Sequence, residues 1–190
     1  VGSYYGEIIQ EITERNHVRE ILSQPATAKW TAWDLGVSDS TSIWVCETIG
    51  GEVRLTDYYE NHGQSLDHYI AWLDENKYRD YTHILPHDVQ VRELQTGKSR
   101  YEFLTDAGLN IDIAPKHSVE DGIIAVRKML PVTWFNKDTT KFGVECLRNY
   151  RRVFNEKLNV YQEKPLHDWS SHCADAFRYL AMGMDTSGTG

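Results

Sequence analysis

The stretch TAWDLGVSDSTSIWVCE, residues 31–47, decides how this sequence is interpreted. An apolar, strand-like run stops at Asp34 and a glycine, passes through small polar residues, and resumes as a second apolar run. A carboxylate left unpaired at the end of a buried strand is energetically expensive. A bound cation or phosphate group is the usual candidate to offset that expense, so the stretch points to a binding site.

The bulk composition is that of a globular protein. The chain has 190 residues, of which 41% are hydrophobic and 25% charged, which fits one domain with a sizeable core. No apolar run approaches the roughly 20 residues of a membrane span, and no signal peptide opens the chain, so a cytoplasmic protein is expected. The sequence begins at Val1 rather than Met and opens as if in the middle of a longer polypeptide, so we expect a fragment.

The three cysteines, Cys46, Cys146 and Cys173, lie far apart in the sequence and form no CxxC pair. An odd and scattered set argues against both a disulfide framework and a zinc knuckle. Reduced thiols in the core are expected.

Charge is distributed unevenly along the chain. The net charge is −8, which argues against a nucleic-acid partner, but residues 116–157 hold nine basic against five acidic residues. That segment is therefore +4 and the remainder −12. A polyanion guided toward a carboxylate-held metal and a merely solvated helix surface explain these counts equally well.

The hydrophobic pattern predicts alternating strands and helices after an initial run of strands. Paired glycines in IGGE predict a hairpin turn between the second and third strands, because glycine readily adopts positive φ. In the fourth helix Ser118 is the expected N-cap. The strands are expected at 29–35, 41–49, 52–60, 81–87 and 109–115, and the helices at 4–22, 65–77, 99–107, 118–130, 139–158 and 169–184. With VTWFN as a short strand or an extended connection, the fold class is α/β, a mixed β-sheet flanked by helices.

Two aspartates share one situation, since Asp34 and Asp88 each stand where an apolar strand ends. If their strands are neighbours, the two carboxylates converge at one edge of the sheet, where sites in open α/β sheets are built. Carboxylates held that close repel unless a cation lies between them, and oxygen ligands suit Mg²⁺ or Mn²⁺. The alternative is that Asp34 begins a turn and Asp88 caps the next segment.

Four segments, in order, resemble the nuclease domain of tailed-bacteriophage terminase large subunits: TAWDLGVSDSTSIWV, HILPHD, NIDIAPKHSVEDGIIAVRKML and HDWSSHCADAFRYLA. The resemblance implies a ribonuclease H-like fold with a carboxylate triad that binds Mg²⁺ or Mn²⁺, as two ions in the sense of the two-metal mechanism. Position by position, it places Asp34, Asp88 and Asp175 as catalytic metal ligands. Asp39, Lys116 and Asp168 are secondary candidates for an outer contact or a DNA contact.

The same resemblance implies a metal-dependent DNA endonuclease that cuts concatemeric double-stranded DNA when packaging starts and ends. Its partners would be double-stranded DNA, the terminase small subunit, the portal protein and an upstream ATPase domain of the same polypeptide. The expected location is the cytoplasm of the infected host, at the procapsid portal. Residues 1–28 would then be a linker and helix from the ATPase domain, 29–185 the nuclease domain and 186–190 a flexible tail.

The helix expected at 169–184 gives a conflicting indication. Asp175 falls with Asp168, His172 and Tyr179, nearly opposite the apolar stripe, so that periodicity alone predicts a surface residue. The stripe consists of Trp169, Cys173, Phe177, Leu180 and Met184.

Three other functions compete with the nuclease interpretation. TGKS at 96–99 is no phosphate-binding P-loop, because Arg92 stands where the motif needs glycine. DLGVSDSTS is close to the first phosphate loop of actin-like and sugar-kinase phosphotransferases, but that fold needs two related halves and a second loop. A catalytically inactive ribonuclease H-like domain that only docks DNA or a partner is the remaining alternative.

Overall fold

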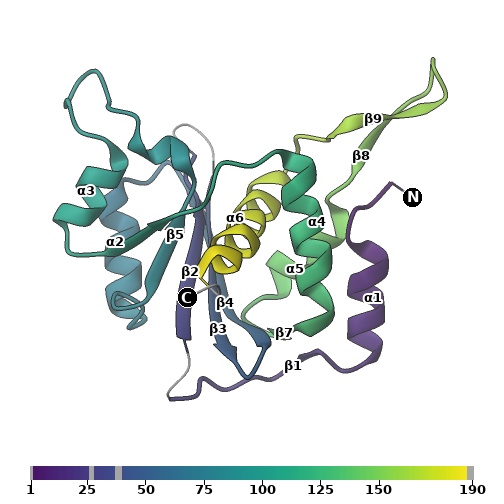
Figure 1. The fold of residues 1–190 in the computed structure, drawn as a ribbon, viewed down its shortest axis with the longest axis horizontal. Coiled ribbons are helices and arrows are strands. Elements are labelled where there is room, and N and C mark those ends of the chain that lie inside the picture. The colour runs from purple at the N-terminus through teal and green to yellow at the C-terminus, as the bar shows by residue number, and fades with distance from the viewer. Residues whose placement is uncertain (1, 26–27, 37–39, 188–190) are drawn as a thin grey trace.

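The computed structural model describes residues 2–25, 28–36 and 40–187 of the chain. They form one seven-stranded sheet in the order β1-β7-β4-β3-β2-β5-β6 and a separate two-stranded hairpin, β8-β9 (Figure 1). β3 runs antiparallel to both of its neighbours, and every other pair in the large sheet is parallel. The strands are β1 Val18–Arg19, β2 Ala28–Asp34, β3 Ser40–Ile49, β4 Glu52–His62, β5 Thr82–Leu85, β6 Asn110–Ile113, β7 Thr133–Asn136, β8 Arg152–Asn155 and β9 Val160–Pro165.

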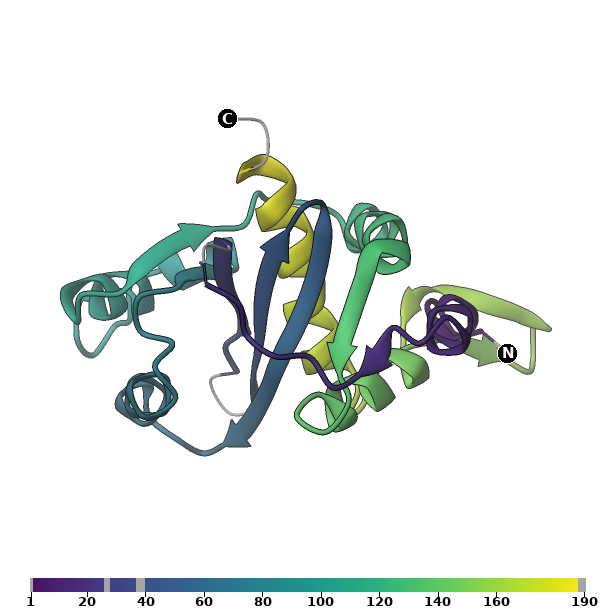
Figure 2. The same cartoon turned by 90° about the horizontal axis from the view of Figure 1, so that it is seen from below.

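Helices cover both faces of the sheet and enclose two hydrophobic cores. The larger core lies under α1, α4, α5 and α6, and the smaller one under α2 and α3. Figure 2 shows α2 and α3 at one side of the molecule, and α1 with the β8–β9 hairpin at the other. The helices are α1 Gly6–Glu14, α2 Leu66–Glu75, α3 Arg100–Asp106, α4 Val119–Met129, α5 Lys141–Asn149 and α6 Ser171–Ser187, with short 3₁₀ turns η1 His87–Gln90 and η2 Leu130–Val132.

Local sequence signals explain the element boundaries that were predicted well. Gly50 and Gly51 both have positive φ at the β3–β4 turn. The Ser118 hydroxyl accepts a hydrogen bond from the Asp121 backbone N–H, as expected of the N-cap of α4. VTWFN contains strand β7, which lies between β1 and β4.

The helix predicted at 4–22 is too long. α1 ends at Glu14 because Asn16 takes a left-handed conformation with φ 64°, and the His17 N–H donates back to the Ile12 carbonyl. The chain then forms β1 beside β7. Tyr5 and Ile9 are fully buried in the larger core, so packing of this domain begins well before residue 29.

The helix predicted at 139–158 is wrong in its second half. α5 ends at Asn149, and a β-hairpin follows. The Asn155 side chain accepts hydrogen bonds from the backbone N–H groups of Lys157 and Leu158, and Asn159 has φ 53°. A turn built by asparagine side chains competes with the helix that the basic and apolar residues suggested.

α6 is buried on more than one side, because it lies across β2 and β3 and also contacts α4 and α5. Small residues allow this close packing, since Ala174, Ala176 and Ala181 are buried along it. Trp169 precedes the helix and is half exposed. The stripe predicted from periodicity therefore underestimated how much of α6 is buried. None of the helices in the described part of the chain is long and apolar enough to cross a membrane.

Candidate functional site

Asp34 is the last residue of β2, as the sequence predicted. β2 pairs in parallel with β5, with Ala32 opposite Ile84, so both strands end at the same edge of the sheet. On the other side, Asp34 pairs with Ser42 of β3. The two aspartate-bearing strands are therefore neighbours, which is the condition under which Asp34 and Asp88 were expected to converge.

Asp88 lies in the 3₁₀ turn η1, which begins two residues after β5 ends at Leu85. Its side chain is exposed, whereas Pro86 and Val89 on either side are buried. These buried neighbours anchor the turn and hold Asp88 at the solvent side of the sheet edge.

Asp175 comes from α6, in its second turn. Its side chain is 25% exposed and that of Asp34 only 16%, so neither is a freely solvated surface carboxylate. The prediction of an outward-facing Asp175 from the helical wheel alone fails, because α6 crosses the sheet and is enclosed by α4 and α5.

The charges of Asp175 and Asp88 both act on the Asp34 carboxylate. Burial raises the pKa of Asp34 above its ordinary value, and the charges of Asp175 and Asp88 raise it further. A hydrogen bond with His172 opposes this rise. Burial is also the largest cause of the raised pKa of Tyr179, and the charges of Asp34, Asp175 and Asp88 add to the rise. Three elements distant in sequence thus bring their carboxylates to one region.

Two of these carboxylates have a nitrogen partner. His172 Nδ1 lies 3.1 Å from Asp34 Oδ2, and Arg178 Nη2 lies 2.8 Å from Asp175 Oδ1. Arg178 is almost completely buried, with 7% of its side chain exposed. The negative charge at this edge of the sheet is therefore partly compensated by groups of the chain itself.

The residues fit a hard divalent cation in kind, because the donors are carboxylate oxygens and the buried Asp34 carries an electrostatic penalty that a cation would relieve. They are not gathered into a ligand shell in this arrangement. Across residues 2–25, 28–36 and 40–187, no group of three or more His, Cys, Asp or Glu side chains is placed so that it could hold a metal ion. The three cysteines Cys46, Cys146 and Cys173 are buried free thiols.

The secondary candidates fall in different places. Lys116 is exposed in the loop between β6 and α4. The Asp168 carboxylate accepts hydrogen bonds from the backbone N–H and the hydroxyl of Ser170, so it shapes the turn that enters α6. Asp39 lies outside the described residues.

Arg178 and His117 belong to no pattern that predicts a catalytic or metal-binding role for them, and Tyr179 is marked only by its position on the same side of the helix as Asp175. The i, i+3 spacing of Asp175 and Arg178 on one helix is a readable signal for an ion pair. His117 has no such signal, because it approaches Arg178 from a loop 61 residues away.

A cavity of about 860 Å³ lies between α4, β9 and α6, and Asp175 and Arg178 are among its lining residues. Arg127 and Arg152 of the basic segment also line it. Part of the positive charge of residues 116–157 therefore shares this cavity with Asp175, together with the acidic Glu120 and Glu163.

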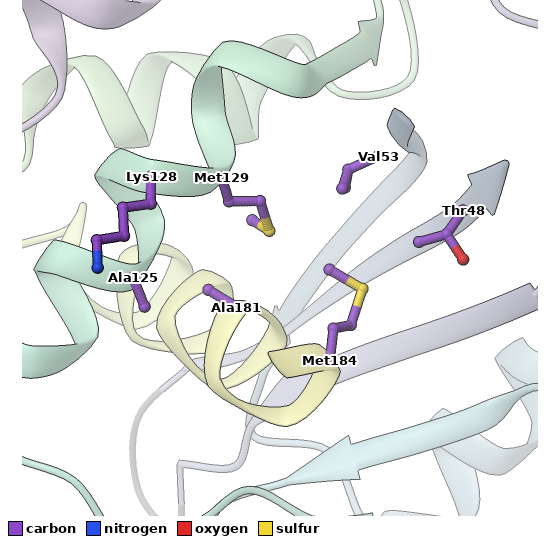
Figure 3. A pocket seen from close by; sticks show the side chains of 7 residues that line it. All are labelled: Thr48, Val53, Ala125, Lys128, Met129, Ala181 and Met184. Carbon is purple, nitrogen blue, oxygen red and sulfur yellow. The ribbon is translucent and has the colours of Figure 1, made fainter. Parts of the chain in front are cut away.

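A smaller pocket of about 290 Å³ lies near the other end of α6 (Figure 3). It is bordered by Met129 and Met184, and Lys128 is its one charged lining residue. Without a carboxylate, this pocket offers no ligand set for a divalent cation.

Solved structures similar to this chain include the large terminase nuclease from thermophilic phage G20c with bound magnesium, with a TM-score of 0.65 and 13% identity over 95% of this chain and 97% of that one. The fold is that of a large-terminase nuclease domain. The large-terminase nuclease domain from bacteriophage SPP1 with bound Mn gives 0.61 and 17% identity over 90% and 95% of the two chains. The predicted ribonuclease H-like mixed sheet flanked by helices, and the predicted resemblance, are confirmed at the level of the fold.

A large terminase from another thermophilic bacteriophage, solved in complex with ATP-gamma-S, matches with a TM-score of 0.70 and 20% identity over 92% of this chain. This chain spans only 44% of the length of that large terminase. Neither a model of a protein family nor a curated protein sequence matches the chain significantly.

Proposed function

We propose that this chain is the metal-dependent endonuclease domain of a viral DNA-packaging terminase large subunit. It cuts concatemeric double-stranded DNA at packaging initiation and termination. The observation that carries the proposal is the placement of the three aspartates in a large-terminase nuclease fold: Asp34 ends β2, Asp88 follows the paired strand β5, and Asp175 is on α6, which packs across β2.

Each carboxylate has a distinct task in this proposal. Asp34 is held rigidly by the ladder between β2 and its neighbours β3 and β5, so its position is set by the sheet. Asp175 is fixed by the packing of α6, and Asp88 is the most exposed of the three. Together they are the residues that would hold Mg²⁺ or Mn²⁺, as two ions. When bound, such ions supply Lewis-acid activation of water and charge stabilisation of the leaving 3′ oxygen.

DNA is expected to approach along the side of the cavity between α4, β9 and α6. Arg127 and Arg152 line this cavity together with Asp175, so they would contact backbone phosphates rather than bases. Lys116 is an exposed cation in the loop before α4 and is a further candidate for a phosphate contact. Sequence-independent binding of this kind weakens as salt rises.

The working assembly proposed here includes an upstream ATPase domain of the same polypeptide, the terminase small subunit and the portal protein. It would operate in the cytoplasm of the infected host, with the motor docked at the procapsid portal. Residues 1–28 would connect the nuclease to the ATPase domain, although Tyr5 and Ile9 already pack into the nuclease core. The sugar-kinase alternative is disfavoured because the described residues form one large sheet rather than two related halves.

Cleavage of supercoiled plasmid in Mn²⁺, Mg²⁺ or EDTA tests the proposal. Asp88→Ala and Asp175→Ala should each reduce metal-dependent cutting by about 100-fold or more, in the range seen when a group that stabilises the transition state is removed. Asp57→Asn is the matched control, because Asp57 is a half-buried carboxylate bonded to Tyr78 on the α2 side of the sheet.

Three outcomes are informative. Loss of cutting in both site variants, with the control intact, supports the triad. Cutting that survives Asp175→Ala removes that residue from the metal-binding set. A wild-type chain that binds DNA but cuts it in no metal overturns the proposal and favours a docking module.

A further inference from the structure

We infer that Arg178 is a positioning residue for Asp175, and that a chain of hydrogen bonds through His117 holds Arg178 in place. The inference rests on the proposed function, because it assigns a role to a neighbour of a proposed metal ligand. It concerns the orientation of the Asp175 carboxylate rather than the identity of the residues that bind metal.

The hydrogen-bond chain runs from the backbone to the carboxylate. His117 Nδ1 lies 2.8 Å from the Pro115 carbonyl oxygen, which can only accept, so Nδ1 carries the proton. His117 Nε2 then accepts from Arg178 Nη1 at 3.3 Å, and Arg178 Nη2 donates to Asp175 Oδ1 at 2.8 Å. The Pro115 carbonyl thus fixes the tautomer of His117, and Arg178 donates at both of its bonds because a guanidinium has no acceptor.

Arg178 is unusual in its burial. It is the one lysine or arginine among the described residues that is buried, and its guanidinium lies 5.5 Å from the centre of the Tyr179 ring. A buried guanidinium is expensive unless it is paired and hydrogen-bonded, so its partners His117 and Asp175 are needed to keep it there. A planar donor held from two sides restricts the rotation of the carboxylate that it contacts.

Helix α4 leaves room for this arrangement at Gly122. A Cβ atom at this position would lie 2.9 Å from Arg178 Cδ and 2.9 Å from His117 Cδ2. Both members of the chain therefore pass against the bare backbone of α4. The Asp175 side chain is therefore oriented by three separate elements: the loop after β6, α4 and α6.

A purely structural role is the competing explanation, in which Arg178 only ties α6 to the loop after β6. The two roles differ in what happens to metal binding below the melting temperature. Replacing a positioning residue changes the affinity for Mn²⁺ without DNA present, whereas replacing a residue with a purely structural role changes only the stability of the fold.

The experiment measures Mn²⁺ binding without DNA, by the EPR signal of free Mn²⁺, together with the melting temperature and the plasmid-cutting rate. Arg178→Met should weaken Mn²⁺ binding about 10-fold or more, the effect typical of removing a group that orients a metal ligand. Arg178→Lys should recover only part of this loss, because it restores a cationic donor but not the planar guanidinium that bonds His117 and Asp175 at once. His117→Gln, whose amide oxygen can accept in place of Nε2, should bind Mn²⁺ more tightly than His117→Leu.

Arg54→Met is the matched control, since Arg54 forms an ion pair with Glu52 at 2.7 Å on β4 and lies outside the site. It should leave Mn²⁺ binding unchanged. Gly122→Ala should weaken Mn²⁺ binding in the same direction as Arg178→Met, because it displaces Arg178 and His117 together.

The outcomes separate this inference from the proposed function. Arg178→Met that melts earlier but binds Mn²⁺ like the wild type overturns the inference, as does a wild-type chain that binds no Mn²⁺. A wild-type chain that binds Mn²⁺ and cuts no DNA overturns the proposed function. In that case weakened Mn²⁺ binding in Arg178→Met still supports the positioning role.

Discussion

Replacing Asp34 with asparagine separates metal binding from fold stability at the centre of the site. Burial and the charges of Asp175 and Asp88 raise the pKa of Asp34, which means that the folded protein disfavours its ionised form. The resulting loss of folding stability is absent below pH 3.8, the ordinary pKa of an aspartate, because Asp34 is then protonated in both states. The loss is fully present once the pH has risen through the raised pKa of Asp34 in the folded protein. At neutral pH in EDTA, Asp34→Asn should therefore melt at the same temperature as the wild type or higher.

Bound metal should reverse the order of the two melting temperatures, so that the wild type melts higher than Asp34→Asn. A ligand at 100 times its dissociation constant stabilises the native state by about 2.7 kcal/mol. For a chain of 190 residues the entropy of unfolding is roughly 0.4 kcal/mol per degree, so the wild type should gain about 7 °C in saturating Mn²⁺. Asp34→Asn, which lacks one proposed ligand and its charge, should gain about 1 °C or less under the same conditions.

Differential scanning fluorimetry over a Mn²⁺ titration measures both effects, with EDTA as the baseline. Asp57→Asn is again the control, because burial also raises the pKa of Asp57 but its partners are Tyr78 and the Tyr58 backbone. It should keep the full Mn²⁺ shift. The reasoning is refuted if Asp34→Asn gains as much from Mn²⁺ as the wild type does, or if it melts several degrees lower in EDTA.

Two further predictions concern the fold that positions the site. Burial lowers the pKa of His83, which is held neutral between the Thr31 hydroxyl and the Arg79 carbonyl, so stability should be complete above pH 6.5 and fall as the pH drops below it. Urea unfolding between pH 7.5 and 5.5 should show this slope in the wild type and a smaller one in His83→Gln. Gly143→Ala would drive a Cβ atom into the Trp44 indole, and should lower the free energy of unfolding by roughly 2 kcal/mol after the gain in helix propensity is counted. Adding Trp44→Phe should recover part of the loss, and strictly additive effects of the two substitutions in denaturant melts would contradict the steric explanation.

Much of the sheet could be predicted because its signals are local. Alternating and continuous apolar runs marked β2, β3 and β4, and Gly50 and Gly51 marked the turn between the last two. The positions of Asp34 and Asp88 after apolar strands were also local facts, so a site at the sheet edge could be predicted from them.

The errors arose where a short-range signal was overridden or was too weak. Asn16 ended α1 early, and Asn155 directed the chain into a hairpin in place of the second half of the helix predicted at 139–158. Both are single side-chain or backbone effects inside stretches whose composition still suits a helix.

The sequence by itself determined strands β2 to β6, the glycine turn between β3 and β4, and the residue types available for metal chemistry, because these depend on periodicity and on the chemistry of each side chain. Only the tertiary structure decided that Asp175 shares a region with Asp34 and Asp88. It also decided that Arg178 bonds Asp175 and that His117 in turn bonds Arg178. A helical wheel describes one helix with a single buried side, whereas α6 packs against the sheet, α4 and α5 at once. Contacts between residues far apart in the chain follow from how elements pack, and that packing has no signature in the spacing of any one segment.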